Sequence, residues 1–298
     1  MIACMDPAAA RASERPCKAP PLTASAPALA SLSLSVPALA TMAPVASSGP
    51  ALLAGTNNDG TGVSWIETNW MFIAFAGGLL GSGVLVARLR QRDLHWYGWL
   101  ALVMYLLHQS EEHAYDFRGW RYAFVPSLNE GVGKLLFSSV CAKGLAACPV
   151  DPKMALYINT VMVWMGFGGC MLASHASQRF YLAGSLCWGT AIVNGLFGHI
   201  LPAVLGFAYN PGLVQSLVMV PLGVFIVRAS SRPWLCLANG FGAHVLALGL
   251  GINLMYRAQL PEAASTIFFN VLGGLALPLG LAWCLGRPAD ADTKYEVF

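Results

Sequence analysis

Trp70–Ala87 reads WMFIAFAGGLLGSGVLVA, 18 consecutive residues without a charged side chain. A helix needs about 20 apolar residues to cross the hydrocarbon core of a bilayer, so this stretch predicts a transmembrane helix. Six further apolar stretches follow: Leu94–Leu107, Met154–Ser174, Phe180–Phe207, Leu213–Val227, Leu235–Tyr256 and Thr266–Leu285. The sequence therefore predicts an all-α fold, a polytopic transmembrane bundle of about seven helices.

The composition supports the same class and excludes others. Of the 298 residues, 56% are hydrophobic and only 10% are charged, which is too apolar for an ordinary soluble domain. The net charge of +3 is spread without a basic run, so we expect the lipid bilayer as a partner and no nucleic acid. No Walker-type Gly-Lys-Ser/Thr motif occurs, so no nucleotide cofactor is expected. The oligomeric state stays undetermined at this point.

Both ends of the chain differ from the apolar region. Residues 1–64 are rich in Ala, Pro and Ser, and their repeated prolines favour a disordered tail. A targeting segment is an alternative reading, because three basic residues precede a mildly apolar stretch there. We therefore predict a tail over 1–64, a transmembrane domain over 65–287 and a polar C-terminal tail over 288–298.

Basic residues in the short connections predict the orientation in the membrane. They gather in every second connection: Arg88, Arg90, Arg92, Arg179, Arg228 and Arg232. The alternating connections are poorer in Lys and Arg, apart from the long segment between Asp116 and Lys153, and long loops count less in this rule. We expect the N-terminus outside and the C-terminus in the cytoplasm.

An unusual polar cluster ends the second apolar stretch, in the run Leu106–Phe117, LLHQSEEHAYDF. Ionisable groups at the edge of a membrane span usually face a partner, a metal or a water-filled cavity. His108, Glu111 and Glu112 are related by i, i+3 and i, i+4 steps, so we expect their side chains on one helix face. On an α-helix, His113 is rotated about 140 degrees from His108 about the helix axis, so we expect it to act on the site indirectly or to have no role there.

The predicted topology brings a second helix to the same depth. Asn194 and His199 lie past the middle of the fourth apolar stretch, toward the same face of the membrane as His108. Imidazoles and carboxylates together suit a divalent metal such as Zn, Fe or Mn. We predict metal ligands among His108, Glu111, Glu112 and His199, with catalytic roles for Glu111, Glu112 and Asn194.

Structural alternatives stay open for each of these residues. Glu111 and Glu112 can instead lie at a water interface, paired with Arg118 and Arg121. Asn194, His199 and His244 can instead link helices by hydrogen bonds without any chemistry.

Several motifs together resemble a known family. These are His108-Gln-Ser-Glu111-Glu112, the run Asp116–Trp120, the segment NGLFGHI from Asn194, and YNPGLVQSLVMVPLG from Tyr209. The chain is similar over about residues 90–230 to the HXXEE family of bacterial integral membrane proteins. This resemblance implies a small helical membrane module, expected in a bacterial inner membrane, whose activity is not established.

Three function classes follow from the sequence. The first is a membrane-embedded metal-dependent enzyme, a hydrolase or oxidoreductase, that acts on a lipid or another hydrophobic small molecule. The second is a proton- or cation-coupled transporter, and the third is a noncatalytic membrane assembly factor.

Two of the eight cysteines suggest a bridge rather than a site. No Cys-x-x-Cys pair occurs, which argues against a zinc ribbon or a haem attachment. Cys141 and Cys148 both fall in the connection predicted to lie outside, where an oxidising compartment permits a disulfide.

Overall fold

The computed structural model describes residues 64–91, 93–141, 148–206 and 209–286. Within these ranges the chain is helical and contains no strand, so the predicted all-α class is confirmed. The two predicted tails lie outside the described residues except for Ser64, which caps α1 (Trp65–Ala87) in a capping box with Glu67.

Among the residues that the structure describes, five helices are long and apolar enough to cross a membrane. They are α1, Pro152–Ala176, Gln178–Gly206, Pro233–Arg257 and Glu262–Leu285. Each of the last four spans is one long rod made of several consecutive elements. The second span contains α6 (Pro152–Tyr157), η5 (Ile158–Phe167) and α7 (Gly168–Ala176), and the third contains η6 (Gln178–Phe180), α8 (Ala183–Val193), η7 (Asn194–Ile200) and α9 (Leu201–Gly206). The fourth contains α11 (Pro233–His244), η8 (Val245–Leu250) and α12 (Gly251–Arg257), and the fifth contains α13 (Glu262–Val271), η9 (Leu272–Ala276) and α14 (Leu277–Leu285).

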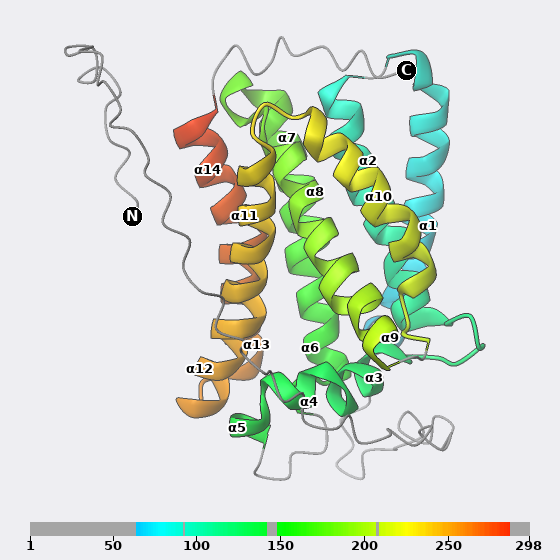
Figure 1. The fold of residues 1–298 in the computed structure, drawn as a ribbon, viewed down its shortest axis with the longest axis vertical. Helices are drawn as coiled ribbons and strands as arrows, with labels where there is room; N and C mark the ends of the chain where they lie inside the picture. The colour runs from blue at the N-terminus through cyan, green and yellow to red at the C-terminus, as the bar shows by residue number, and fades with distance from the viewer. Residues whose placement is uncertain (1–63, 92, 142–147, 207–208, 287–298) are drawn as a thin grey trace, which may run out of the picture. The chain divides into compact units, whose positions relative to one another are not determined.

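Two shorter rods complete the bundle. α2 (Leu94–Gln109) follows the short 3-10 turn η3 (Leu89–Gln91) and continues into η4 (Ser110–Ala114), while α10 (Leu213–Ala229) follows the fourth span. Figure 1 shows both running alongside the longer helices. The described part of the chain thus has five helices long enough to cross a membrane and these two shorter ones, where the sequence predicted about seven transmembrane helices.

Small residues let the helices approach closely. A Cβ at Gly240 of α11 would collide with the backbone of Gly189 in α8, so these two helices meet backbone to backbone. Likewise, a Cβ at Gly166 would lie 2.7 Å from the carbonyl oxygen of Gly274 in η9. Such contacts are typical of membrane helices, whose association depends on close packing more than on the hydrophobic effect.

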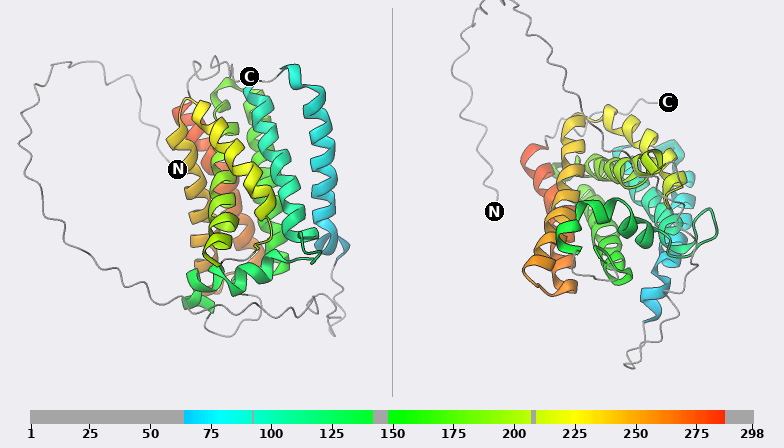
Figure 2. Two further views of the ribbon diagram at one scale, coloured as in Figure 1. Left: turned by 45° about the vertical axis from the view of Figure 1, so that its right-hand side comes forward. Right: turned by 60° about the horizontal axis from the view of Figure 1, so that its bottom comes forward.

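The segment between η4 and α6 lies at one end of the bundle. It contains α3 (Phe124–Glu130), α4 (Val132–Leu136) and α5 (Ser138–Cys141), which lie across the ends of the long helices (Figures 1 and 2). The turns that carry Arg88, Arg179 and Arg228 lie at the opposite end, as the alternation of the rods requires.

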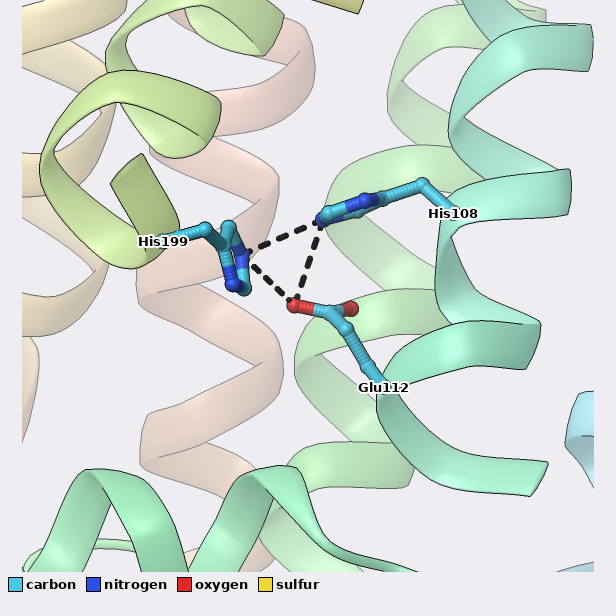
Figure 3. A group of neighbouring side chains, drawn as sticks. All are labelled: His108, Glu112 and His199. Atoms are coloured by element: carbon cyan, nitrogen blue, oxygen red, sulfur yellow. Dashed lines mark hydrogen bonds and ion pairs between the residues drawn. The ribbon is translucent and has the colours of Figure 1, made fainter. Parts of the chain in front are cut away.

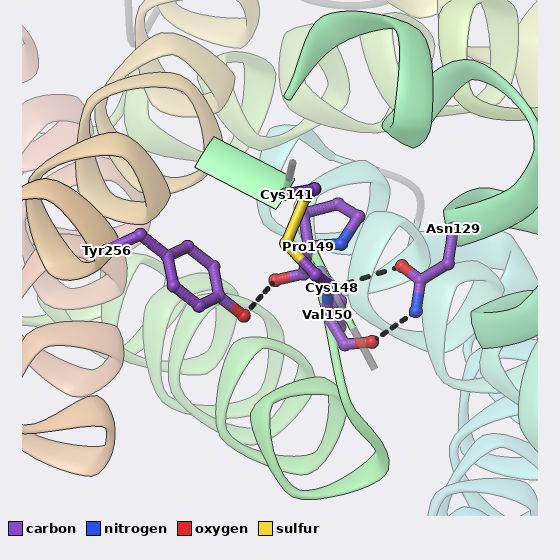
Figure 4. Close-up of a disulfide and its surroundings, with 6 residues drawn as sticks. All are labelled: Asn129, Cys141, Cys148, Pro149, Val150 and Tyr256. Carbon is purple, nitrogen blue, oxygen red and sulfur yellow. Dashed lines mark hydrogen bonds between the residues drawn. A yellow bond between two sulfur atoms is a disulfide. The ribbon is translucent and has the colours of Figure 1, made fainter. Parts of the chain in front are cut away.

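A disulfide joins Cys141 to Cys148 in this end segment, as the sequence suggested (Figure 4). Polar contacts hold the residues beside it. Asn129 exchanges two hydrogen bonds with the backbone of Val150, and the Tyr256 hydroxyl donates to the carbonyl of Pro149 at 3.2 Å. The bridge thus belongs to a segment that is tied both to α3 and to α12.

Candidate metal centre

The helix that carries the His-Glu motif changes its winding within the motif. α2 ends at Gln109, and η4 is a π-helical turn in which the amide of Tyr115 donates to the carbonyl of Ser110, five residues earlier. In an α-helix, positions i+3 and i+4 flank position i. In the wider π-turn, i+4 stays near position i while i+3 turns away. Glu112 therefore remains under His108, and Glu111 does not.

Three side chains from two distant parts of the chain meet at one point (Figure 3). His108 Nε2 lies 3.1 Å from His199 Nε2, and Glu112 Oε1 lies 3.4 Å from the first nitrogen and 3.0 Å from the second. His199 comes from η7, which is also a π-helical turn. These three atoms form the group in the described residues that is arranged to hold a metal ion, and we call it the His-Glu triad.

The triad is enclosed by protein. His108 and His199 are 0% exposed and Glu112 is 3% exposed. Aromatic rings surround it: Tyr105 meets His108 edge-on, and Phe124 of α3 packs against His199. Since a lone carboxylate is costly to bury, its charge needs partners inside this space.

The turn before α10 fixes the orientation of the His199 ring. His199 Nδ1 lies 3.0 Å from Asn210 Oδ1 and 2.6 Å from the carbonyl oxygen of Pro211. A carbonyl oxygen only accepts, so Nδ1 carries a proton and donates it. In the neutral ring, Nε2 then holds the free lone pair that faces the triad, which is the usual arrangement of a metal-binding histidine.

Gly212 allows this turn to approach both imidazoles. Its φ is +90°, in the left-handed region that favours glycine, and a Cβ there would lie 2.7 Å from the His199 ring and 2.8 Å from the His108 ring. No motif argument from the sequence assigned a role to Gly212, although the quoted Tyr209-Asn210-Pro211-Gly212 turn contained the signal.

Asn194 completes one side of the triad. Its Nδ2 atom lies 3.4 Å from His108 Nε2 and 3.2 Å from His199 Nε2. The structure therefore brings together four of the residues singled out in the sequence: His108, Glu112, His199 and Asn194.

Glu111 lies outside the triad, and this differs from the common face predicted for the two glutamates. Its carboxylate accepts hydrogen bonds from the Tyr209 hydroxyl at 2.7 Å and from the backbone amides of Val214 at 3.1 Å and Gln215 at 2.9 Å. Burial, above all, raises the pKa of Tyr209, so the hydroxyl stays protonated and donates to Glu111. The π-turn is the reason for the difference, because it turns position i+3 away from His108.

A chain of amides approaches the triad from the third rod. The Trp164 indole donates to Gln109 Oε1 at 2.8 Å, Gln109 Nε2 donates to Asn159 Oδ1 at 3.0 Å, and Asn159 Nδ2 lies 3.2 Å from His113 Nε2. An indole N–H only donates, so it sets the direction of both amides. His113 in turn lies 3.6 Å from Glu112 Oε2, which fits the indirect role expected for it.

The arginines do not pair with the motif glutamates. Arg118 forms a salt bridge with Asp116 at 2.8 Å, and Arg121 donates to the carbonyl of Thr68. The interfacial alternative for Glu111 and Glu112 therefore lacks the partners that it proposed. His244 Nδ1 donates to the carbonyl oxygen of Gly240 in its own helix, at 2.8 Å.

Comparison with known proteins identifies one family. Residues 99–226 match the model of a family described as a protein of unknown function with an HXXEE motif. No curated protein and no solved structure is significantly similar to the chain. The matched range contains the His-Glu triad, Asn194 and the turn at Tyr209–Gly212. The predicted resemblance is thus confirmed: residues 99–226 match the HXXEE family model, and His108 and Glu112 of the triad lie in its motif.

Proposed function

We propose that the protein is a membrane-embedded metal-dependent enzyme whose metal is bound by His108, Glu112 and His199. The observation that carries the proposal is the triad itself: two imidazole nitrogens and one carboxylate oxygen, 3.0–3.4 Å apart and buried. Tetrahedral ligation at about 2.0–2.1 Å separates the ligand atoms by roughly 3.3–3.4 Å, so these atoms need only small shifts to bind one ion.

The surroundings of the triad support a metal. His199 already donates Nδ1–H to Asn210 and Pro211, so the ring is turned with Nε2 toward the ion. Both imidazole nitrogens and the carboxylate oxygen point at the same space, and a cation there would balance the buried charge of Glu112. Glu111 is no part of the proposed ligand set, because three donors already hold its carboxylate.

Three protein ligands favour catalysis over a purely structural ion. Structural zinc sites are closed by four protein ligands, whereas catalytic sites keep a position for water or substrate. A bound metal supplies an activated water or a Lewis acid. Asn194 faces the same space and could hydrogen-bond a fourth ligand.

Metal identity and reaction class are linked. Two histidines and one glutamate suit zinc in hydrolases, and two histidines with one carboxylate also suit non-haem Fe(II) in oxidoreductases. Manganese is the third option. The substrate in the proposal is a lipid or another hydrophobic small molecule, because the triad lies among helices whose outer faces are apolar.

The disulfide supports the orientation that the arginines predict. It lies in the end segment, opposite the arginine-bearing turns. Disulfides persist in oxidising compartments, and basic turns favour the cytoplasmic side, so both features place this end outside. In the proposal the triad is therefore nearer the outer face, with the N-terminus outside and the C-terminus in the cytoplasm of a bacterial inner membrane.

Elemental analysis of the purified full chain tests the proposal. We expect one zinc, iron or manganese per chain, lost in His108→Ala, Glu112→Gln and His199→Ala. His175→Ala and Glu130→Gln are matched controls, since both side chains are exposed and neither belongs to the triad. Wild-type protein that takes up none of the three metals under anaerobic reconstitution, or folded triad variants that keep full stoichiometry, would overturn it.

Complete burial of the two imidazoles favours a second candidate, a noncatalytic assembly role in which the ion only ties α2 to η7. The two candidates differ in the fourth ligand. Water exchange at bound Mn²⁺, measured by proton relaxation, is expected for the enzyme and absent for a closed structural site.

A further inference from the structure

Glu111 is the ionisable residue of the His108–Glu112 motif that the proposed metal centre does not use. It is buried, 3% exposed, and both oxygens of its carboxylate are engaged. Burial of a charged side chain is expensive unless its partners are specific, so its three donors indicate what it does.

Two of those donors are backbone amides in the first turn of α10, Val214 and Gln215. The first amides of a helix have no partner inside the helix, and a side chain of the N-cap residue usually satisfies them. Here the N-cap residue is Gly212, which has no side chain to offer. Glu111 therefore caps α10 from another helix, and its negative charge suits the positive end of the helix dipole.

The third donor extends this contact to the turn that precedes α10. The Tyr209 hydroxyl donates to Glu111, and three residues later Gly212 packs against both imidazoles of the triad. Between them, Asn210 and Pro211 accept the Nδ1 proton of His199. Glu111 thus fastens the turn on both sides of the two acceptors that orient His199.

We propose that Glu111 is a positioning residue: by capping α10 and binding Tyr209, it holds the Asn210-Pro211 acceptors in place and so presents His199 Nε2 to the triad. The adjacent glutamates then have separate tasks. Glu112 binds at the triad, and Glu111 orients the imidazole opposite it. The inference deepens the proposed function, but the orientation of His199 exists with or without a metal.

The experiment measures the His199 tautomer and the metal affinity separately, in the full chain in detergent. Variants are Glu111→Ala, Glu111→Gln and Tyr209→Phe, with Glu130→Gln as the exposed control. In metal-free wild type, ¹⁵N NMR of labelled histidine is expected to show His199 with the proton on Nδ1. Zinc titration is then expected to give a 10- to 100-fold weaker affinity in Glu111→Ala at unchanged saturating stoichiometry.

The metal-free spectrum is the readout that mere loss of stability would not move. Folded Glu111→Ala should show His199 in a mixture of tautomers. Tyr209→Phe removes one donor of three, so it should fold even where Glu111→Ala does not, and it should show a smaller change in the same direction. Glu111→Gln should lie between the two.

Two results would overturn the inference. One is a loss of stoichiometric metal at saturation in folded Glu111→Gln, which would make Glu111 a ligand. The other is an unchanged His199 tautomer and unchanged affinity in Glu111→Ala and Tyr209→Phe. If wild type binds no metal at all, the proposed function fails, and the metal-free spectra still decide the role of Glu111.

Discussion

His108 Nε2 and His199 Nε2 lie 3.1 Å apart although they belong to different rods, and both face the same oxygen of Glu112. Because His199 donates its proton from Nδ1, it brings a lone pair to this contact. The other two atoms must then supply a proton between them or share a cation. A metal ion bound at the proposed site would therefore be coupled to folding stability.

Metal is expected to stabilise the folded protein. An ion that binds only the folded state raises the free energy of unfolding by about 2.7 kcal/mol at a free concentration 100 times its Kd. Thermal unfolding in detergent, with zinc buffered at several concentrations, checks this. The shift should vanish in Glu112→Gln and persist in Glu130→Gln. An equal shift in both variants would show that the metal binds elsewhere.

Gly212→Ala is expected to damage the triad more than a backbone effect alone explains. The substitution combines a strained φ of +90° with a Cβ placed 2.7 Å from the His199 ring. Gly119→Ala is the matched control, because Gly119 also has a positive φ, +79°, but has open space around it. We expect each to cost about 1–2 kcal/mol for the backbone, with an added loss of metal affinity only in Gly212→Ala. Equal metal affinity in the two variants would contradict the close approach.

Asn159→Leu is expected to destabilise the bundle because it leaves buried donors and acceptors unpaired. Gln109 Nε2 would lose its acceptor and His113 would lose its neighbour. Each such group costs about 1–3 kcal/mol. Asn253→Leu is the control, since its amide bonds only to Gly249 in its own helix. The free energies of unfolding of the two variants, measured with denaturant, should differ by at least about 1 kcal/mol. Similar midpoints would argue against a continuous amide chain.

The disulfide should contribute to stability and report the orientation. Its seven-residue separation corresponds to about 2–3 kcal/mol in the loop-entropy account. A membrane-impermeant maleimide should label Cys148→Ser at Cys141 from the outside of intact cells, with the double variant Cys141→Ser, Cys148→Ser as the blank. Labelling restricted to inside-out vesicles would reverse the assigned orientation.

Alkaline pH should weaken the contact between Tyr122, in the segment before α3, and α1. Burial raises the pKa of Tyr122 to about 12, and its hydroxyl donates to the carbonyl of Glu67. Because the pKa is raised, the stabilisation by the Tyr122 hydroxyl is fully present below pH 10, the pKa in the unfolded chain, and is lost as the pH rises through about 12. The free energy of unfolding, measured from pH 9 to pH 12, should fall less steeply with pH in Tyr122→Phe than in wild type.

The helical spans could be predicted because their signal is local. Five of the apolar runs lie in helices long enough to cross a bilayer, and the structure extends several of them by only a few residues, as at Trp65 for α1 and Pro152 for α6. The disulfide was suggested by the same reasoning, since topology placed both cysteines on one side of the membrane.

The site could be predicted only in part, because its details depend on long-range contacts. The predicted depths in the bilayer placed His199 and Asn194 beside His108, and the structure has all three in contact. The division between Glu111 and Glu112 could not be foreseen from α-helical periodicity, since it follows from a π-turn. The tautomer of His199 depends on the carbonyl of Pro211, which lies 12 residues further along the chain and contacts the ring only in the tertiary structure.

The π-turn of η4 has a consequence for the length of the motif. Such a turn is an α-helix that accommodates one inserted residue. It lets the consecutive residues Glu111 and Glu112 point to two different neighbours, α10 and the triad. Deleting Ser110 would return the segment to ordinary winding and rotate the pair about the helix axis. A protein one residue shorter here would lose either the contact of Glu111 with the start of α10 or the contact of Glu112 with the two imidazoles.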